Sequence, residues 1–175
     1  MELQTNRDLL VRDVSPEDAV AIVAILTPII EARSYTVFDV PFTADAERDY
    51  INNFPARGVW KVAVRRLNGR VVGFQVLEPF GTYTKAFNHV ASLGTYVDLT
   101  QRRQGIAKAL FAETFRTARE KGYEKIFTFV RADNPAALAT YQAQGFQIVG
   151  IARQHVKIDG RHIDEIMIEK VFSRD

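Results

Sequence analysis

A run of basic and small residues near the middle of the chain could bind a phosphate group. It follows a β-rich segment, leads into a predicted helix and consists of Arg102, Arg103, Gln104, Gly105, Ile106, Ala107 and Lys108. The start of a helix presents unpaired backbone N–H groups and the positive end of the helix dipole, and both favour anions. Gly105 leaves room for an anion beside the backbone, and the guanidinium groups match phosphate geometry. The alternative interpretation is a helix start that is basic and small without binding a ligand.

A second segment, about thirty residues further along, carries groups suited to proton donation and hydrogen bonding. The phenol of Tyr141, with an ordinary pKa near ~10, stays protonated at neutral pH and can donate a proton. Asn134 offers an amide. Each residue also has a structural alternative, because Tyr141 could be a core aromatic and Asn134 could cap a helix that begins at Pro135. The common nucleotide patterns Gly-x-x-x-x-Gly-Lys-Ser/Thr and Gly-x-Gly-x-x-Gly are absent from the sequence.

Together, the two segments resemble the acyl-CoA core of the GNAT superfamily of N-acetyltransferases. That family carries Arg/Gln-x-x-Gly-x-Gly/Ala, matched here by Arg102, Gly105 and Ala107. It also carries Asn-x-x-Ala-x-x-x-Tyr-x-x-x-Gly-Phe, matched from Asn134 to Phe146. The resemblance is most specific over residues 89–146. It implies a single N-acetyltransferase domain over residues 1–175, with acetyl-CoA as the acyl donor.

The resemblance also implies roles for individual residues. The diphosphate would meet the backbone N–H groups from Gln104 to Lys108. The pantetheine arm would pair with the end of the preceding strand, where two strands splay, commonly with a bulge; this end comprises Tyr96, Val97 and Asp98. Asn134 would contact the cofactor arm. Tyr141 would be the general acid that protonates the departing thiolate.

The general base is less clearly indicated than the acid. An alkyl ammonium of pKa about 10 must lose a proton before its nitrogen can attack. Relatives often place a glutamate on the strand before the phosphate loop, but residues 89–95 contain no acid and Ser92 stands at that position. His89 could act directly, or Ser92 could position a water, with Glu31 and Glu78 as electrostatic contributors. A lone histidine at a strand start is alternatively a structural residue.

By the same resemblance, the acceptor would lie between the first two helices and the last hairpin. The candidate lining residues are Glu31, Arg33, Tyr35, Phe38 and His162. The stretch from Lys157 to Glu165 resembles the tail of the phosphinothricin and amino-acid N-acetyltransferase branch, which favours a small amine, such as an amino acid or an analogue. Two alternatives stay open: acetylation of a protein N-terminus or lysine, and a catalytically silent acyl-CoA-binding module.

Turn, cap and periodicity signals predict an α/β chain with a mixed, mostly antiparallel central sheet and about four flanking helices. Ser15 and Thr43 are typical helix caps, Asn68-Gly69 is typical of a hairpin turn, and Gly122 and Gly145 are typical helix ends. The expected strands are 9–13, 60–65, 70–77, 89–97, 126–130, 146–157 and 162–171. The expected helices are 16–33, 44–54, 108–121 and 135–144.

Composition narrows the class of protein. The chain of 175 residues is 47% hydrophobic and 25% charged, which is typical of a soluble domain. A net charge of +2 with scattered basic residues gives no support to nucleic-acid binding. The sequence has no cysteine, three separated histidines and no run of about 18 apolar residues, so neither a metal site nor a membrane span is expected. We expect a cytoplasmic enzyme, and a homodimer is compatible with the sequence.

Overall fold

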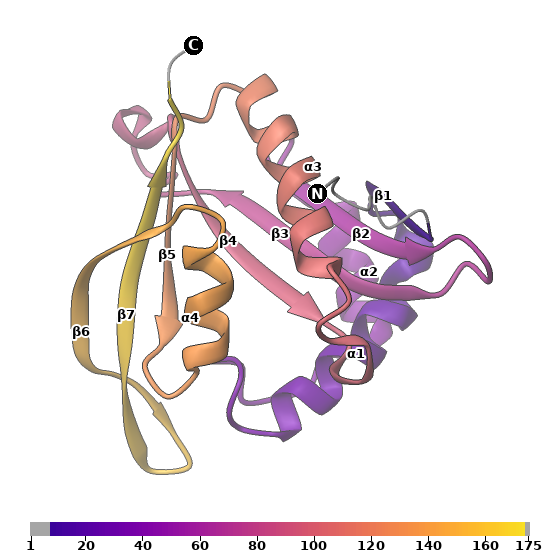
Figure 1. Cartoon of the computed structure of the whole chain (residues 1–175), viewed down its shortest axis with the longest axis horizontal. Helices are drawn as coiled ribbons and strands as arrows, with labels where there is room; N and C mark the ends of the chain where they lie inside the picture. The colour runs from indigo at the N-terminus through magenta and orange to yellow at the C-terminus, as the bar shows by residue number, and fades with distance from the viewer. Residues whose placement is uncertain (1–7, 174–175) are drawn as a thin grey trace, which may run out of the picture.

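The computed structural model describes residues 8–173, which form one mixed sheet flanked by helices (Figure 1). The sheet order is β1-β2-β3-β4-β5-β7-β6. Only β4 and β5 run parallel; the other neighbours are antiparallel. The predicted fold class is therefore confirmed. The strands are β1 (Leu9–Asp13), β2 (Val59–Arg65), β3 (Val71–Pro79), β4 (Val90–Val97), β5 (Lys125–Arg131), β6 (Gln147–Ile158) and β7 (Arg161–Val171).

Four α-helices cover the two faces of the sheet: α1 (Ala19–Glu31), α2 (Ala44–Asn52), α3 (Ile106–Glu120) and α4 (Pro135–Gln142). One apolar cluster joins α1 and α2 to β2 and β3 around Trp60 and Phe74. Other clusters join α3 to the opposite face (Figure 1). The expected first helix is divided, because Pro16–Asp18 form a 3₁₀ turn before α1. The predicted cap at Thr43 is confirmed, since its side chain accepts from the backbone N–H of Ala46.

The parallel strands β4 and β5 separate soon after they begin. Their pairing is confined to Val90 with Lys125 and Ala91 with Ile126. Beyond these pairs the strands diverge (Figure 1), whereas β3 and β4 stay in register from Ala91 to Val97. The expected splay is present. The expected bulge is not found in this β3–β4 ladder, so the splay arises where β5 turns away from β4.

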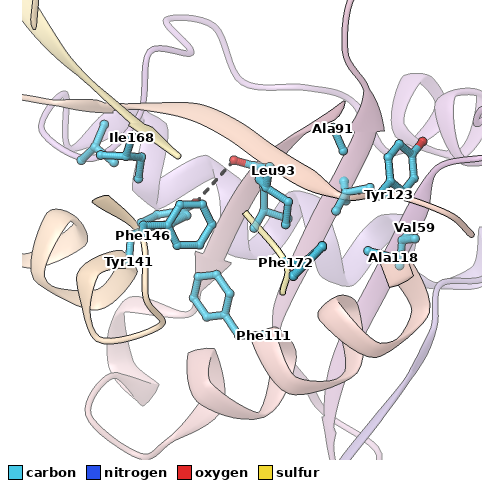
Figure 2. Close-up of a cluster of buried hydrophobic side chains, with 13 residues drawn as sticks. Val59, Ala91, Leu93, Phe111, Ala118, Tyr123, Tyr141, Phe146, Ile168 and Phe172 are labelled. Atoms are coloured by element: carbon cyan, nitrogen blue, oxygen red, sulfur yellow. Dashed lines mark hydrogen bonds between the residues drawn. The ribbon is translucent and has the colours of Figure 1, made fainter. Parts of the chain in front are cut away.

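A cluster of aromatic and aliphatic side chains fills the space beside the splay (Figure 2). Phe111 of α3, Tyr141 of α4 and Phe146 meet edge to face or tilted, with ring centroids 5.1–6.2 Å apart. Leu93 of β4 and Ile168 of β7 belong to the same cluster. This packing holds α4 against the opening, because burial of large aromatic side chains is a strong stabilising contribution.

Within residues 8–173, no helix is long and apolar enough to cross a bilayer. The same part of the chain contains no group of three or more His, Cys, Asp or Glu side chains arranged to hold a metal ion.

Candidate active site

A cavity of about 760 Å³ occupies the region where β4 and β5 separate. Its walls come from α1 through Leu26, from α2 and the segment between these helices, from strands β2 to β5, from α4 and from β7. The polar and charged lining residues include Tyr35, Glu47, Tyr50, Glu78, Ser92, Thr95, Tyr96, Thr128, Arg131, Asn134, Tyr141 and Glu165. The cavity therefore combines residues from both halves of the sequence.

The backbone of β4 presents alternate residues to the splay. The N–H of Asp98 donates to the carbonyl of Val72 at 3.0 Å, and the N–H of Phe80 donates to that of Val90 at 3.1 Å. Because backbone groups alternate along an antiparallel ladder, Tyr96 also directs its N–H and C=O toward β3. The backbone groups of Leu93, Thr95 and Val97 then face away from β3, toward the gap. The Leu93 carbonyl accepts from Thr128 Oγ1 at 2.9 Å, so the edge that can accept an extended arm as an added strand is at Thr95 and Val97.

The predicted pantetheine contacts therefore need a correction. Val97 keeps backbone groups that face the gap, but the backbone of Tyr96 and the N–H of Asp98 are directed to β3, and the Asp98 carbonyl accepts from the N–H of Gln101 at 2.9 Å. The Asp98 carboxylate is also engaged, since it accepts from Arg70 at 2.6 Å and from the Thr100 N–H at 2.8 Å. Thr95, which the sequence analysis missed, is a better placed neighbour of Val97. Tyr96 instead contributes its ring, which lines the cavity and stacks on Phe74 at 4.9 Å.

The start of α3 has the features of an anion site. The first intrahelical bond runs from the N–H of Ala109 to the carbonyl of Gly105 at 3.0 Å, so the N–H groups of Ile106, Ala107 and Lys108 have no partner within the helix. Gly105 precedes the helix with φ of 75°, in the left-handed region. A Cβ built on Gly105 would meet open space. The helix therefore presents its first N–H groups beside an unobstructed glycine.

Basic side chains surround this helix start. Arg102, Arg103 and Lys108 are exposed, and the guanidinium of Arg102 lies 4.1 Å above the ring of Tyr35. The side-chain oxygen of Gln104 accepts a hydrogen bond from Arg65. Gln104 itself precedes α3, so the helical N–H groups begin two residues later than the sequence suggested. The positive charges and the helix dipole act in the same direction at this point.

Tyr141 is both a core aromatic and a cavity residue. Its side chain is 7% exposed, its ring packs against Phe111 and Phe146 (Figure 2), and it also lines the cavity. The phenol oxygen lies 3.1 Å from Thr95 Oγ1 and 3.5 Å from the carbonyl oxygen of Leu93. Burial raises the pKa of Tyr141 to about 12. Its phenol therefore stays protonated at neutral pH and can donate a proton.

Asn134 likewise combines the two interpretations made from the sequence. Its side-chain oxygen accepts from the N–H of Ala137 at 3.2 Å, which caps α4. Its amide nitrogen donates to the carbonyl of Tyr35 at 3.4 Å, and the residue lines the cavity. Arg131 makes a parallel contact, donating to the carbonyl of Thr36 at 2.8 Å. These two bonds hold the segment after α1 against α4 and β5.

Strand β4 has Ser92 at the position where an acid was expected, and the structure places a carboxylate beside it on the neighbouring strand β3. Glu78 of β3 pairs directly with Ser92 of β4, so the two side chains share one face of the sheet. Both residues line the cavity. Tyr50 donates a hydrogen bond to Glu78 Oε1 at 2.6 Å, while Oε2 makes no hydrogen bond within residues 8–173. This pairing therefore places the Glu78 carboxylate next to Ser92.

Several predicted residues lie away from the cavity. His89 is exposed, is not among the lining residues, and uses its carbonyl to accept from the N–H groups of Glu124 and Lys125. Glu31, Arg33 and His162 also lie outside the lining, whereas Tyr35 and Phe38 belong to it.

Two buried acids of the cavity were missed by the sequence analysis. Glu47 of α2 is 6% exposed and Glu165 of β7 is 7% exposed. Burial raises the pKa of both carboxyl groups. Glu47 resembles an ordinary acid near a helix start, and Glu165 an ordinary polar residue of a hairpin. No local signal distinguishes them from solvent-facing acids.

Comparisons with known proteins find matches to this chain in both sequence and fold. Residues 29–146 match the model of the Acetyltransferase (GNAT) family. YwnH of Bacillus subtilis (strain 168), whose name marks it as a candidate phosphinothricin acetyltransferase, is 26% identical over 148 residues, or 84% of this chain and 89% of YwnH. Ribosomal-protein-alanine N-acetyltransferase from Brucella melitensis superposes with a TM-score of 0.86 at 27% identity, covering 93% of this chain and 99% of that one. Phosphinothricin acetyltransferase from Sinorhizobium meliloti, solved with AcCoA, shares the fold, with a TM-score of 0.86 at 19% identity over 95% of this chain and 89% of that one.

Proposed function

Since this chain belongs to the GNAT family of acetyltransferases, we propose that it is an N-acetyltransferase that transfers the acetyl group of acetyl-CoA to the primary amine of a small molecule. Amino acids and their analogues are the acceptor class suggested by the name of YwnH. The observation that carries the proposal is the cavity between β4 and β5. It brings a protonated phenol, a free strand edge and a carboxylate to one place.

The residues present suit acetyl-CoA, which supplies an activated acetyl thioester. We assign the diphosphate to the N–H groups of Ile106, Ala107 and Lys108, with Arg102 and Arg103 beside them. The free backbone edge at Thr95 and Val97 suits the amides of the pantetheine arm. Asn134 lies on the α4 side of the same cavity. These assignments follow from open donors and acceptors on the protein.

Glu78 acts as the general base and Tyr141 acts as the general acid. Glu78 accepts a proton from the substrate ammonium, directly or through a water held by Ser92. The free amine nitrogen then bonds to the acetyl carbonyl carbon and loses its second proton to solvent, while the carbon–sulfur bond breaks. Tyr141 donates a proton to the departing thiolate, and the proton taken by Glu78 passes through solvent to restore the phenol. The products are the N-acetyl amine, free CoA and one released proton.

The fixed segment after α1 favours a small acceptor over a protein. Hydrogen bonds from Arg131 and Asn134 to the carbonyls of Thr36 and Tyr35 bind this segment to β5 and α4. The ring of Tyr35 is further covered by Arg102. A peptide substrate would need a longer open groove. The segment after α1 is held at three points and does not leave that room. A free amine on a short molecule needs only the cavity.

An acceptor screen tests the proposed function. The enzyme is mixed with acetyl-CoA and with amino acids, diamines, aminoglycosides or short peptides, and release of free thiol is measured. We expect thiol release that depends on a small amine, with the N-acetyl product identified by mass spectrometry. Acetylation of peptides alone would assign the chain to protein modification. Tight CoA binding without amine-dependent release would instead identify a silent binding module.

Replacing Tyr141 by phenylalanine tests the proton donor. We expect kcat to fall about ten-fold, less than for most general acids because a thiolate leaves easily, while the KM for acetyl-CoA stays within about two-fold. In the unchanged enzyme, kcat should not decline up to a pH of about 10, because the raised pKa of Tyr141 keeps the phenol protonated. Tyr83→Phe, at a residue 85% exposed, is the matched control. An unchanged kcat in Tyr141→Phe would show that this residue has a purely structural role.

A further inference from the structure

We propose that the acceptor is a diamine, a primary amine that carries a second ammonium group and no acidic group, and that Glu47 binds the second ammonium. This inference rests on the proposed function and names the substrate class of the same cavity. It differs from the acceptor suggested by the relatives' names, because an amino acid carries a carboxylate and phosphinothricin also carries a phosphinate.

The charges that line the cavity favour a cation. The charged lining side chains are three carboxylates, Glu47, Glu78 and Glu165, and one guanidinium, Arg131. An anionic acceptor would have to approach this excess of negative charge in a partly desolvated space, which is costly. A dication would be attracted by it.

Among the described residues that line the cavity, the one guanidinium already has hydrogen-bond partners. Arg131 donates through Nε and Nη2 to the two carboxylate oxygens of Asp133, at 2.8 and 2.7 Å, and through Nη1 to the carbonyl of Thr36. Asp133 also accepts from Arg161 at 3.0 Å. These bonds use three of the five N–H donors of Arg131, and the Asp133 carboxylate already compensates its charge, so a substrate carboxylate would bind this residue less strongly than a free guanidinium.

Glu47 is the lining carboxylate that lacks a partner. Glu78 accepts from Tyr50 at 2.6 Å, and Glu165 lies 3.9 Å from His155 Nε2. The carboxylate of Glu47 makes no hydrogen bond and no ion pair within residues 8–173, although the residue is 6% exposed. Buried acids are usually paired, because an ionised carboxylate without a partner is unstable in a protein interior. A bound ammonium would supply the missing partner.

Aromatic rings line the same cavity as this carboxylate and also suit an organic cation. Tyr50, Trp60, Phe74, Tyr96 and Phe38 line the cavity as successive neighbours, with ring centroids 4.9–6.3 Å apart. Aromatic faces attract ammonium groups and pack against methylene chains. The unpaired N–H of Trp60 is a single neutral donor and does not offset the carboxylates. The cavity thus combines a wall for a carbon chain with anionic groups for its ends.

Three acceptors that differ by one group each test this inference. They are 1,5-diaminopentane, lysine, which adds a carboxylate, and pentylamine, which lacks the second ammonium. We expect kcat/KM to be highest for the diamine, about ten-fold lower for pentylamine and lower again for lysine, since one charge-assisted contact contributes roughly ten-fold. The series 1,4-diaminobutane, ornithine and butylamine repeats the comparison with a shorter chain.

Replacing Glu47 by glutamine keeps the shape of the side chain and removes its charge. We expect the KM for 1,5-diaminopentane to rise about ten-fold, while kcat/KM for pentylamine changes less than about two-fold. Retained pentylamine activity shows that the variant is folded and that its catalytic groups are intact. Asp49→Asn, at an exposed acid of the same helix, is the matched control and should leave both acceptors unaffected.

The outcomes separate this inference from the proposed function. Lysine acetylated as well as the diamine, or a Glu47→Gln variant that loses both amines equally, would overturn the diamine assignment and leave small-amine acetylation in place. The same holds if these amines are inert and another small amine is acetylated. If no small amine led to release of free thiol from acetyl-CoA, the proposed function itself would be contradicted.

Discussion

Replacing Glu78 by glutamine is expected to lower kcat/KM for an amine acceptor by about 1,000-fold at neutral pH. Glutamine preserves the hydrogen bond from Tyr50 but cannot accept the proton that the substrate ammonium must lose. General bases contribute typically about 100-fold to 10,000-fold to catalysis. The measurement is the rate of acceptor-dependent thiol release across a range of amine concentrations, with the affinity for acetyl-CoA determined separately.

The pH profile distinguishes loss of a base from general damage. As pH approaches the ammonium pKa of about 10, more of the amine is already deprotonated, so the deficit of Glu78→Gln should shrink. Glu31→Gln is the matched control, since Glu31 is an exposed acid at the end of α1 and does not line the cavity. A deficit that stays constant with pH, or an unaltered rate at neutral pH, would rule out Glu78 as the proton acceptor.

Replacing Gly105 by glutamate is expected to weaken the binding of acetyl-CoA by about 100-fold. The new carboxylate would stand at the start of α3 and compete with the diphosphate for the N–H groups of Ile106, Ala107 and Lys108. Loss of charge-assisted hydrogen bonds worth about 2–3 kcal/mol corresponds to this factor. Isothermal titration calorimetry of CoA and acetyl-CoA with the purified variant provides the measurement.

A second glycine controls for backbone strain. Gly69 has φ of 70° and Gly105 has φ of 75°, and a Cβ at either position would meet open space. Gly69→Glu therefore carries a similar conformational cost, of about 1 kcal/mol in stability, in a hairpin turn outside the cavity. We expect both variants to lose similar thermal stability, but only Gly105→Glu to lose CoA affinity. Equal affinities would exclude the helix start as the phosphate site.

The amino-acid sequence by itself determined the helices and strands, and it indicated the segment to which we assign the phosphates of the cofactor. Helix starts at Thr43 and Asn134 and the glycine before α3 are set by side chains and backbone angles within a few residues, so local patterns reveal them. The segments around Gly105 and Tyr141 were sufficient to indicate an acyl-CoA protein, because each motif is contiguous.

Only the tertiary structure decided which residues face one another across the cavity. The residues 80–89 between β3 and β4 are too long a connection to fix their register, so the sequence could not place Glu78 beside Ser92. The pairing of β4 with β3 likewise decided that Val97, and neither Tyr96 nor Asp98, turns its backbone to the gap. It also left His89 outside the cavity.

The position of Glu47 depends on contacts still further apart in the chain. This acid lies on α2, while the rings and carboxylates around it come from the α1–α2 segment, β2, β3, β4 and β7. Burial of Glu47 follows from packing of these elements and leaves no trace in the periodicity of a nine-residue helix. Local physical chemistry thus indicated the phosphate site that we propose at the α3 start, and long-range packing determined which acids line the cavity.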